Sequence, residues 1–318
     1  MSLSSNEAGR AFELACLTAL YRALQPTTEV SIVDNYSFRA ARRSWNDTPA
    51  DFRKNVRLAA VAATEKLLEL EPTLTAGSTT LTAGSRPRLY LRITLDEEGE
   101  AGDVRDIVVT CPDNGWEIGL SVKHNHFAVK HSRLSPTIDF GAKWYKLPCS
   151  DSYWQSVRPI FDRLVREQSR HLRWSDLADK EDGVYIPLLN AFMHELHSAA
   201  RRDPDFPRRM VEYLLGEHDF YKIIARDDIR ATEIQPFNLR GRLDRSIAVM
   251  SLPTKIENMR IRSWGKNTVE LYFDSGWSFS FRIHNASSYV EPSLKFDIQL
   301  TAQNTGKPII CRWEKAQS

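Results

Sequence analysis

The sequence predicts an α/β fold, in which helices flank a mixed sheet and a β-rich module follows at the C-terminus. Two segments with helical periodicity open the chain of 318 residues, and strand-like runs follow them. Two further helical segments, at 151–171 and 184–216, precede a stretch from about residue 245 in which short apolar runs alternate with Asn, Gly, Ser and Pro. We therefore expect an α/β domain with a helical insertion at 1–240 and a β-rich module at 241–318.

The first two helices are predicted by periodicity and by their end signals. Residues 6–24 carry an apolar stripe at helical spacing, with Asn6 as a candidate N-cap and Pro26 as the terminator. Residues 50–70 open after Pro49 and are rich in Ala, Leu, Glu and Lys, which favour helices. Both segments are therefore expected to be helical.

The remaining elements are strands and helices joined by loops. A connection rich in Thr, Ser and Gly covers roughly 72–86, and the alternating apolar residues of 88–95 then predict a strand. Turn residues at 203–207 break the helical segment 184–216. Four runs predict the strands of the C-terminal module: 256–261, 269–273, 277–283 and 294–300.

Residues 103–133 contain the most informative pattern, a β-hairpin with one apolar face and one polar face. Asp106 precedes a β-branched run, and the turn signal Pro112-Asp113-Asn114-Gly115 supplies the positive φ angles of a tight turn. Because strand side chains alternate, the second strand has two distinct faces. The apolar face carries Trp116, Ile118, Leu120 and Val122, and the polar face carries Glu117, Gly119, Ser121 and Lys123. Acids and a lysine on one face indicate a functional site.

The composition argues against several classes of protein. An apolar content of 42% supports a core, but no uninterrupted apolar run is long enough to span a membrane, so no membrane partner is expected. The N-terminus lacks the basic and apolar regions of a secretion signal, which predicts a cytoplasmic protein. The four cysteines are scattered without paired spacing, which argues against a zinc ribbon or a disulfide framework. Glycine-rich phosphate-binding motifs are absent, so we expect no nucleotide cofactor.

The net charge of +2 does not by itself indicate a nucleic-acid partner, but the distribution of charge is uneven. Local basic clusters in a near-neutral protein are compatible with a phosphate-binding groove, although solvated helix faces explain most such runs. The basic residues are concentrated in two segments, one with Arg39, Arg42, Arg43, Arg53, Lys54 and Arg57, the other with Lys123, Lys130, Arg133, Lys143 and Lys146.

The polar face of the hairpin offers the residue types that phosphodiester hydrolysis requires. That reaction needs a hard divalent cation held by carboxylates, a positioned water and positive charge near the scissile phosphate. In nucleases of the PD-(D/E)xK type, an Asp begins one strand, and an acid-x-Lys tripeptide on the next strand points at the same metal and water. Asp106 and Lys123 fit this pattern, and we expect Asp106 to lie opposite Ser121.

Ser121 stands where the tripeptide has an acid, so a second carboxylate is needed. We favour Glu13, because a helix packed behind the hairpin would let this carboxylate reach the cation. Glu117, on the same face as Lys123, and Asp103 are the alternative metal ligands. Taken alone, Asp106 is equally compatible with a turn or strand-edge position, whereas Lys123 alone is more typical of an exposed strand end and Glu13 alone of a solvated helix face.

The polar segment that follows the hairpin is the candidate DNA-contacting surface. Lys and Arg bind phosphates, and Arg or Asn can read base edges. A polar loop leaving the sheet is the alternative, whereas a zinc site at His124 and His126 lacks partners in the sequence. His194 and His197 have two residues between them where a metalloprotease helix needs three, so exposed helix positions are expected there. The candidate DNA-binding residues are His124, Asn125, His126, Lys130, His131, Arg133, Lys143 and Lys146.

Several segments resemble the HaeIII family of type II restriction endonucleases. The most specific is 116–126, which ends in Ser121-Val122-Lys123-His124-Asn125-His126 and continues into a similar stretch at 128–135. Residues 6–13, 219–222 and 280–287 extend the similarity to both halves of the chain. The resemblance implies a restriction-endonuclease-like PD-(D/E)xK core, with Asp106 and Lys123 as the core pair and Ser121 in the variable acid position.

The resemblance also implies a function within a restriction-modification system. It implies Mg²⁺-dependent cleavage of double-stranded DNA at a short palindromic site, GGCC. A palindrome suits a homodimer in which each subunit cuts one strand. The basic residues of the module at 241–318 are compatible with a DNA clamp or a dimerisation surface, and a purely structural sandwich is the alternative. Two alternatives stay open: a sequence-specific DNA-binding protein in which Ser121 marks a degenerate nuclease site, and a metal-dependent hydrolase of another substrate.

Overall fold

The chain folds into two compact units, each built around its own sheet. The computed structural model describes residues 4–76, 88–100, 102–113, 115–302 and 308–313. Most of the connection expected at 72–86, and Asn114 of the expected turn, lie outside these residues. Unit 1 comprises Met1–Phe127, Glu217–Met250 and Thr305–Ser318, and unit 2 comprises Ala128–Gly216 and Ser251–Asn304. The mixed α/β class predicted from the sequence is confirmed.

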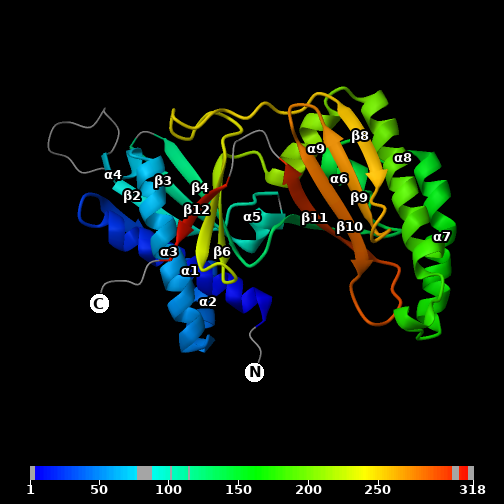
Figure 1. The fold of residues 1–318 in the computed structure, drawn as a ribbon, viewed down its shortest axis with the longest axis horizontal. Coiled ribbons are helices and arrows are strands. Elements are labelled where there is room, and N and C mark those ends of the chain that lie inside the picture. Colours follow the sequence, from blue (N-terminus) through cyan, green and yellow to red (C-terminus); the bar gives the residue numbers. More distant parts are fainter. Residues whose placement is uncertain (1–3, 77–87, 101, 114, 303–307, 314–318) are drawn as a thin grey trace. The chain divides into compact units, whose positions relative to one another are not determined.

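Unit 1 contains a seven-stranded mixed sheet in the order β1-β2-β3-β4-β6-β7-β12 (Figure 1). β1 pairs with β2 and β4 with β6 in parallel, and the other neighbours are antiparallel. The sheet is therefore assembled from strands far apart in the sequence. The strands are β1 (Glu29–Ile32), β2 (Arg88–Ile93), β3 (Ile107–Cys111), β4 (Trp116–His124), β6 (Phe220–Arg226), β7 (Ala231–Phe237) and β12 (Ile309–Arg312).

The helices of unit 1 confirm the two long predictions and add shorter elements. They are α1 (Ser5–Leu24), α2 (Tyr36–Asp47), α3 (Ala50–Leu70), α4 (Thr73–Ala76) and α5 (Asp96–Glu100). The expected N-cap at Asn6 is wrong by two residues. Ser4 caps α1, because its hydroxyl accepts from the backbone N–H of Glu7 while the Glu7 carboxylate accepts from the backbone N–H of Ser4.

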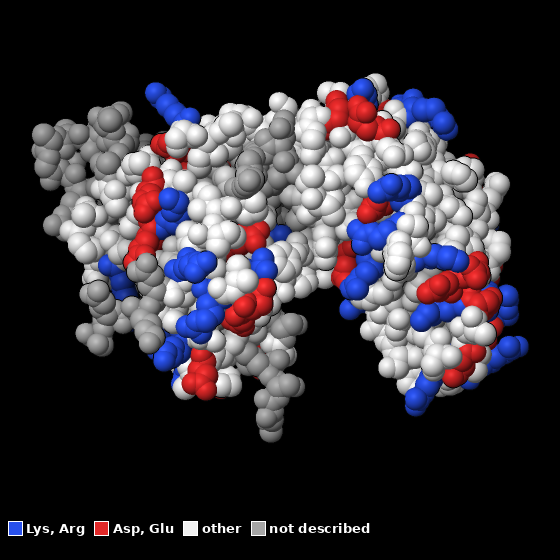
Figure 2. All heavy atoms as spheres, in the orientation of Figure 1, with Lys and Arg blue, Asp and Glu red and all other residues white. Residues whose placement is uncertain are grey.

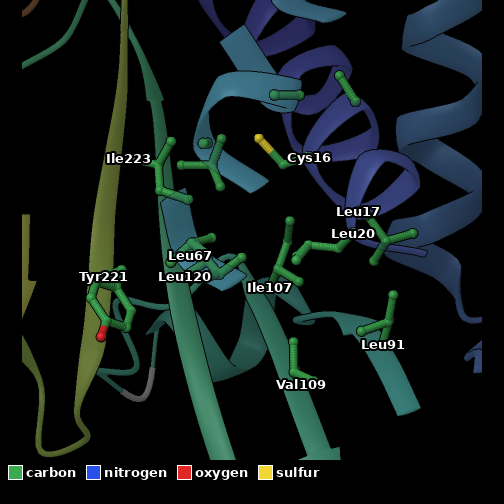
Figure 3. Close-up of a cluster of buried hydrophobic side chains, with 14 of the residues drawn as sticks. Cys16, Leu17, Leu20, Leu67, Leu91, Ile107, Val109, Leu120, Tyr221 and Ile223 are labelled. Atoms are coloured by element: carbon green, nitrogen blue, oxygen red, sulfur yellow. The ribbon is translucent and has the colours of Figure 1, made fainter. Parts of the chain in front are cut away.

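The core of unit 1 fills the space between α1, α3 and one face of the sheet. Figure 3 shows Leu17 and Leu20 of α1 pointing toward Ile107 and Leu120 on the adjacent strands. The predicted apolar face of β4 is buried in this cluster, since Ile118, Leu120 and Val122 all belong to it. Burial of one whole face fixes the register of the hairpin, because a slip of one residue would turn its polar face into the core.

Unit 2 contains a five-stranded antiparallel sheet in the order β5-β11-β10-β9-β8. Aromatic side chains from helices and strands form its core, among them Phe140, Trp144, Phe192, Phe281 and Phe296. The strands are β5 (Ala128–Leu134), β8 (Ile256–Ile261), β9 (Thr268–Phe273), β10 (Ser278–Asn285) and β11 (Leu294–Ala302). The helices are α6 (Phe140–Tyr145), α7 (Asp151–Ser169), η1 (Trp174–Asp176), η2 (Lys180–Tyr185), α8 (Ile186–Arg202) and α9 (Phe206–Leu215).

The observed division differs from the boundary expected between residues 240 and 241. Residues Glu217–Met250 belong to unit 1, where β6 and β7 extend the sheet beyond β4. The C-terminal β12 also joins this sheet, by pairing with β7. In turn, β5 and the helices of 128–216 belong with the C-terminal strands, because β5 pairs with β11.

Candidate active site

Asp106 lies beside Ser121, as the hairpin pattern predicts. Ile107 on β3 and Leu120 on β4 are register partners, so Asp106 and Ser121 are the next pair outward. The backbone N–H of Asp106 donates to the carbonyl of Leu120 at 2.8 Å. At the other end of the hairpin, Gly115 has a φ of 66°, the left-handed conformation that the turn requires.

The Asp106 carboxylate is held by three donors from β4. Its Oδ2 accepts from Lys123 Nζ at 2.8 Å and from the backbone N–H of Val122 at 2.6 Å. Ser121 Oγ lies 3.4 Å from the same oxygen. Within the described residues Oδ1 has no hydrogen bond, so one carboxylate oxygen is fixed by the protein and the other is available to a ligand.

Glu13 approaches this pair from α1. Burial, and then the neighbouring Asp106 carboxylate, raise the pKa of Glu13 to about 8. Burial also favours the neutral form of Lys123, but Asp106 and Glu13 outweigh it and raise the pKa of Lys123. The structure therefore brings together Asp106, Ser121, Lys123 and Glu13, the four residues that the sequence proposed as catalytic.

Asp103 and Glu117 form a separate ionic cluster around Arg105. Arg105 Nη2 lies 2.8 Å from Asp103 Oδ2, and Arg105 Nη1 lies 2.9 Å from Glu117 Oε1. The pKa of Asp103 is lowered, because its bonds to Arg105 outweigh the effect of burial. A Cβ on Gly119 would lie 2.0 Å from Arg105 Cδ, so the glycine makes room for the arginine. The structure thus pairs both alternative metal ligands with a guanidinium.

Lys222 on β6 is a site neighbour that the sequence reasoning did not identify. It is the register partner of Ser121 and is only 4% exposed. Its Nζ donates to the carbonyl of Phe127 at 2.8 Å, and burial, reinforced by Lys123, lowers the pKa of Lys222 to about 7. A single lysine inside the apolar run 220–225 was the signal that could have indicated this position.

The candidate DNA-binding residues fall in both units. In unit 1, His124 Nε2 and Asn125 Nδ2 each lie 2.8 Å from Asp227 Oδ2, and His126 is exposed. Asn125 has a φ of 49°, so the chain turns sharply directly after β4. Asp227, on the loop after β6, is thus a structural partner that the sequence did not predict.

The candidates of unit 2 include a cluster of three lysines. Lys130 Nζ donates to the carbonyl of Tyr213 at 2.8 Å and lies 4.0 Å from the centre of its ring. Burial, together with the charges of Lys143 and Lys146, lowers the pKa of Lys130 to about 8. Lys143 and Lys146 are exposed, and repulsion among the three lysines marks a position where an anion would be favoured.

The other two candidates of unit 2 lie on β5 and have partners on neighbouring segments. His131 Nδ1 lies 2.9 Å from Asp297 Oδ1, and Arg133 Nη1 donates to Ser293 Oγ at 3.1 Å. Elsewhere in the view of Figure 2, basic and acidic side chains are interspersed over both units. Local clusters, rather than one continuous basic face in this view, therefore carry the positive charge.

Asp106 and Lys123 at the ends of adjacent strands, with Glu13 of α1 beside them, form the kind of site that the sequence predicts for a metal-dependent nuclease. Comparison with known proteins identifies the family. The model of the HaeIII restriction endonuclease family matches residues 9–304. The chain is also 44% identical over 310 residues to the type II restriction enzyme HaeIII of Haemophilus aegyptius, covering 94% of this chain and 95% of the relative.

The chain belongs to the HaeIII restriction endonuclease family. It is a type II restriction endonuclease, a site-specific deoxyribonuclease that acts on double-stranded DNA. No solved structure shows a significant match to the chain. None of the helices in the described part of the chain has both the length and the apolar character that a membrane crossing requires.

Proposed function

We propose that this chain hydrolyses phosphodiester bonds of double-stranded DNA at GGCC in a Mg²⁺-dependent reaction catalysed by the Asp106–Lys123 site. The observation that carries the proposal is the Asp106 carboxylate, which Lys123 and the backbone of Val122 hold by one oxygen beside a second carboxylate, Glu13. The target sequence rests on the family resemblance. A palindromic target would be cut by a homodimer, one strand per subunit.

The donors of the site fit Mg²⁺. This ion prefers hard oxygen ligands and is commonly held by one or two carboxylates, with waters completing its shell. Asp106 and Glu13 provide two carboxylates; burial and then repulsion by Asp106 raise the pKa of Glu13, and a divalent cation would relieve that repulsion. Among the described residues no group of three or more His, Cys, Asp and Glu side chains is arranged to hold a metal, so waters or the substrate would complete the shell.

We assign the reaction steps to three side chains. Asp106 and Glu13 would hold Mg²⁺, which when bound stabilises negative charge on the phosphate. Lys123, whose raised pKa keeps it cationic, orients the attacking water beside the scissile phosphate. In-line displacement would then leave a 3′-hydroxyl and a 5′-phosphate. Because its proposed substrate is DNA inside the cell, we expect the enzyme to act in the cytoplasm.

The test is digestion of supercoiled DNA containing GGCC with wild type, Lys123→Ala and a control, Lys66→Ala. Lys66 lies on α3 and forms a surface pair with Glu69 that contributes little stability. We expect wild type and Lys66→Ala to cut in Mg²⁺ at the same sites, and Lys123→Ala to lose at least about a hundredfold in rate. Lys123→Ala should still bind a GGCC duplex in Ca²⁺.

Two outcomes would contradict the proposal. Wild-type protein that shifts the duplex in a gel but never cuts it in Mg²⁺ would support the binding protein with a degenerate site, in which Ser121 replaces a lost ligand. Cleavage by Lys123→Ala at the wild-type rate would show that the Asp106–Lys123 site does not catalyse the reaction. Sequencing of the cut ends separates GGCC from any other target.

A further inference from the structure

The hairpin between β8 and β9 exposes a tryptophan at its tip. The indole of Trp264 is 86% exposed, the largest value among the large hydrophobic side chains of the described residues. Trp is usually largely buried, because leaving so much apolar surface in water costs folding free energy. This position is therefore unusual, and nothing in unit 2 covers it within the described residues.

The loop that carries Trp264 is anchored at its base. The backbone N–H of Arg262 donates to the carbonyl of Thr268 at 2.8 Å, which closes the hairpin. Asn267 is tied to β10, since its side chain donates to the carbonyl of Ile283 and its own carbonyl accepts from the Ile283 N–H. Gly265 turns the chain with a φ of 67°. The indole is thus presented from a fixed support.

Positive charge surrounds the tip. Residues 260–267 include three cations, Arg260, Arg262 and Lys266, and no acid. Both arginines donate to one carboxylate, Glu270, at 2.8 Å and 3.0 Å, so one acid orients two cations and neutralises one of them. Ser263 and Lys266, on either side of Trp264 and Gly265, are exposed. An apolar ring between cations is a surface suited to a polyanion with aromatic bases.

We propose that this hairpin tip, residues 262–267, is a separate DNA-binding element of the enzyme. Trp264 would contact bases or sugars of the duplex, while Arg262 and Lys266 pair with phosphates on either side. A two-stranded ribbon fits the major groove of B-DNA, where an apolar side chain can contact base edges such as the thymine methyl group. The inference rests on the proposed DNA-cleaving function, and it adds a contact in unit 2 beyond the candidate residues of 130–146.

Duplex DNA fits this tip better than a second copy of the chain. A symmetric contact between two copies would bring the same cationic tips together, and like charges repel. β8 is also an edge strand of its sheet, and its exposed Arg260 discourages pairing with another strand. DNA provides the negative charge that the tip lacks, together with base edges and sugars that the indole can contact.

The experiment compares wild type, Trp264→Ala, Trp264→Phe and a matched control, Val165→Ala. Val165 is an exposed apolar residue of α7 in the same unit. Binding of a fluorescent GGCC duplex is measured in Ca²⁺ over a range of salt, and sedimentation reports the oligomeric state. Trp264→Ala should weaken binding about tenfold without changing the salt slope, since it removes no charge. Trp264→Phe should retain most of the affinity, and Val165→Ala all of it.

A charge variant provides the complementary readout. Lys266→Gln should reduce the salt slope by about one, because a single phosphate contact is lost. If Trp264→Ala binds the duplex as tightly as wild type, the proposal is wrong. It is also wrong if Trp264→Ala changes the oligomeric state seen by sedimentation while each assembled enzyme binds DNA with unchanged affinity. Wild-type cleavage in Mg²⁺ is recorded alongside. Failure of wild type to cut refutes the proposed function, whereas normal cutting with an unaffected Trp264→Ala refutes only the hairpin element.

Discussion

Ser121 on β4 and Lys222 on β6 are register partners in a parallel pair, so their side chains stand side by side on the sheet face that carries Lys123. The position that is an acid in the acid-x-Lys tripeptide therefore adjoins a buried lysine in this chain. An acid at 121 would have paired with Lys222. With serine there, the carbonyl of Phe127 is the hydrogen-bond acceptor of Lys222 within the described residues.

Replacing Lys222 by methionine should stabilise the protein, and most strongly at low pH. The pKa of Lys222 is lowered to about 7 in the folded state, so between pH 7 and its ordinary pKa near 10.5 the unfolded chain holds a proton that the folded chain does not. Stability of wild type therefore rises with pH across that range. Lys222→Met should be more stable by about 3 kcal/mol at or below pH 7, with the gain shrinking toward pH 10.

Denaturant unfolding from pH 6 to pH 10 measures this gain. Lys222→Arg is the contrasting variant, because arginine stays charged and should destabilise the protein at every pH in that range. A gain for Lys222→Met that does not depend on pH would show that the lysine is not neutral in the folded protein. A loss of stability at pH 7 would show that its bond to Phe127 outweighs its burial.

The sequence predicted the hairpin and its polar face because both depend on short-range physics. A turn signal and a period of two place Asp106 opposite Ser121, two residues from Lys123, and burial of the apolar face enforces that register. The position of Glu13 could also be predicted, because the amphipathic helix α1 has to cover that apolar face. The hydrogen bond from the backbone of Val122 to Asp106 could not be predicted, because it depends on the exact course of the strand end.

The neighbours of the site that were missed are brought in by long-range pairing. Lys222 reaches Ser121 through a parallel contact between strands about a hundred residues apart, which no local pattern specifies. The division into two units differs from the expected boundary for the same reason, since β12 pairs with β7 and β5 pairs with β11. Arg105 was overlooked because the space it fills beside Gly119 is visible only in three dimensions.

Replacing Glu13 by glutamine should weaken the use of Mg²⁺ while leaving stability nearly unchanged. Burial and Asp106 raise the pKa of Glu13 to about 8, so its carboxyl is largely protonated at neutral pH in the metal-free protein and an amide resembles it. The Mg²⁺ concentration for half-maximal cleavage should rise on the order of tenfold. Glu65→Gln, on the exposed side of α3, is the control.

Cleavage rates over a Mg²⁺ titration, with melting temperatures at pH 7, distinguish the two effects. Identical Mg²⁺ titrations for Glu13→Gln and wild type would show that Glu13 does not bind the metal. A large fall in melting temperature together with weaker cleavage would instead indicate that the carboxylate holds α1 against the hairpin.

Replacing Gly119 by alanine should destabilise the protein through Arg105. The new Cβ would lie 2.0 Å from Arg105 Cδ and 3.2 Å from the Cβ of Phe220, so the arginine must move away from Asp103 and Glu117. Arg105 is only 6% exposed, and breaking a buried ionic cluster costs about 3 kcal/mol. Two carboxylates would then be left without their cation.

Gly9→Ala is the matched control for this substitution. Gly9 lies within α1, and a Cβ there would meet nothing within 4 Å. Alanine is the better helix former, so Gly9→Ala should raise the free energy of unfolding by up to about 1 kcal/mol. Equal effects of the two substitutions in urea unfolding would show that Arg105 adapts to the added methyl group.

Binding of DNA at the cluster of Lys130, Lys143 and Lys146 should draw a proton onto Lys130. Burial and the two neighbouring lysines lower its pKa to about 8, and a phosphate placed among them would raise it. At pH values between the pKa of Lys130 in the free protein and its pKa in the complex, binding takes up a proton. Affinity should therefore be constant below pH 8 and fall as the pH rises from 8 to 10.

Two variants test this prediction. Lys130→Arg stays charged and should flatten the pH dependence, while Lys143→Gln should raise the pKa of Lys130 and reduce the salt slope by about one. Fluorescence anisotropy with a GGCC duplex in Ca²⁺ measures both effects, and a pH profile of Lys130→Arg identical to that of wild type would place the DNA phosphates elsewhere.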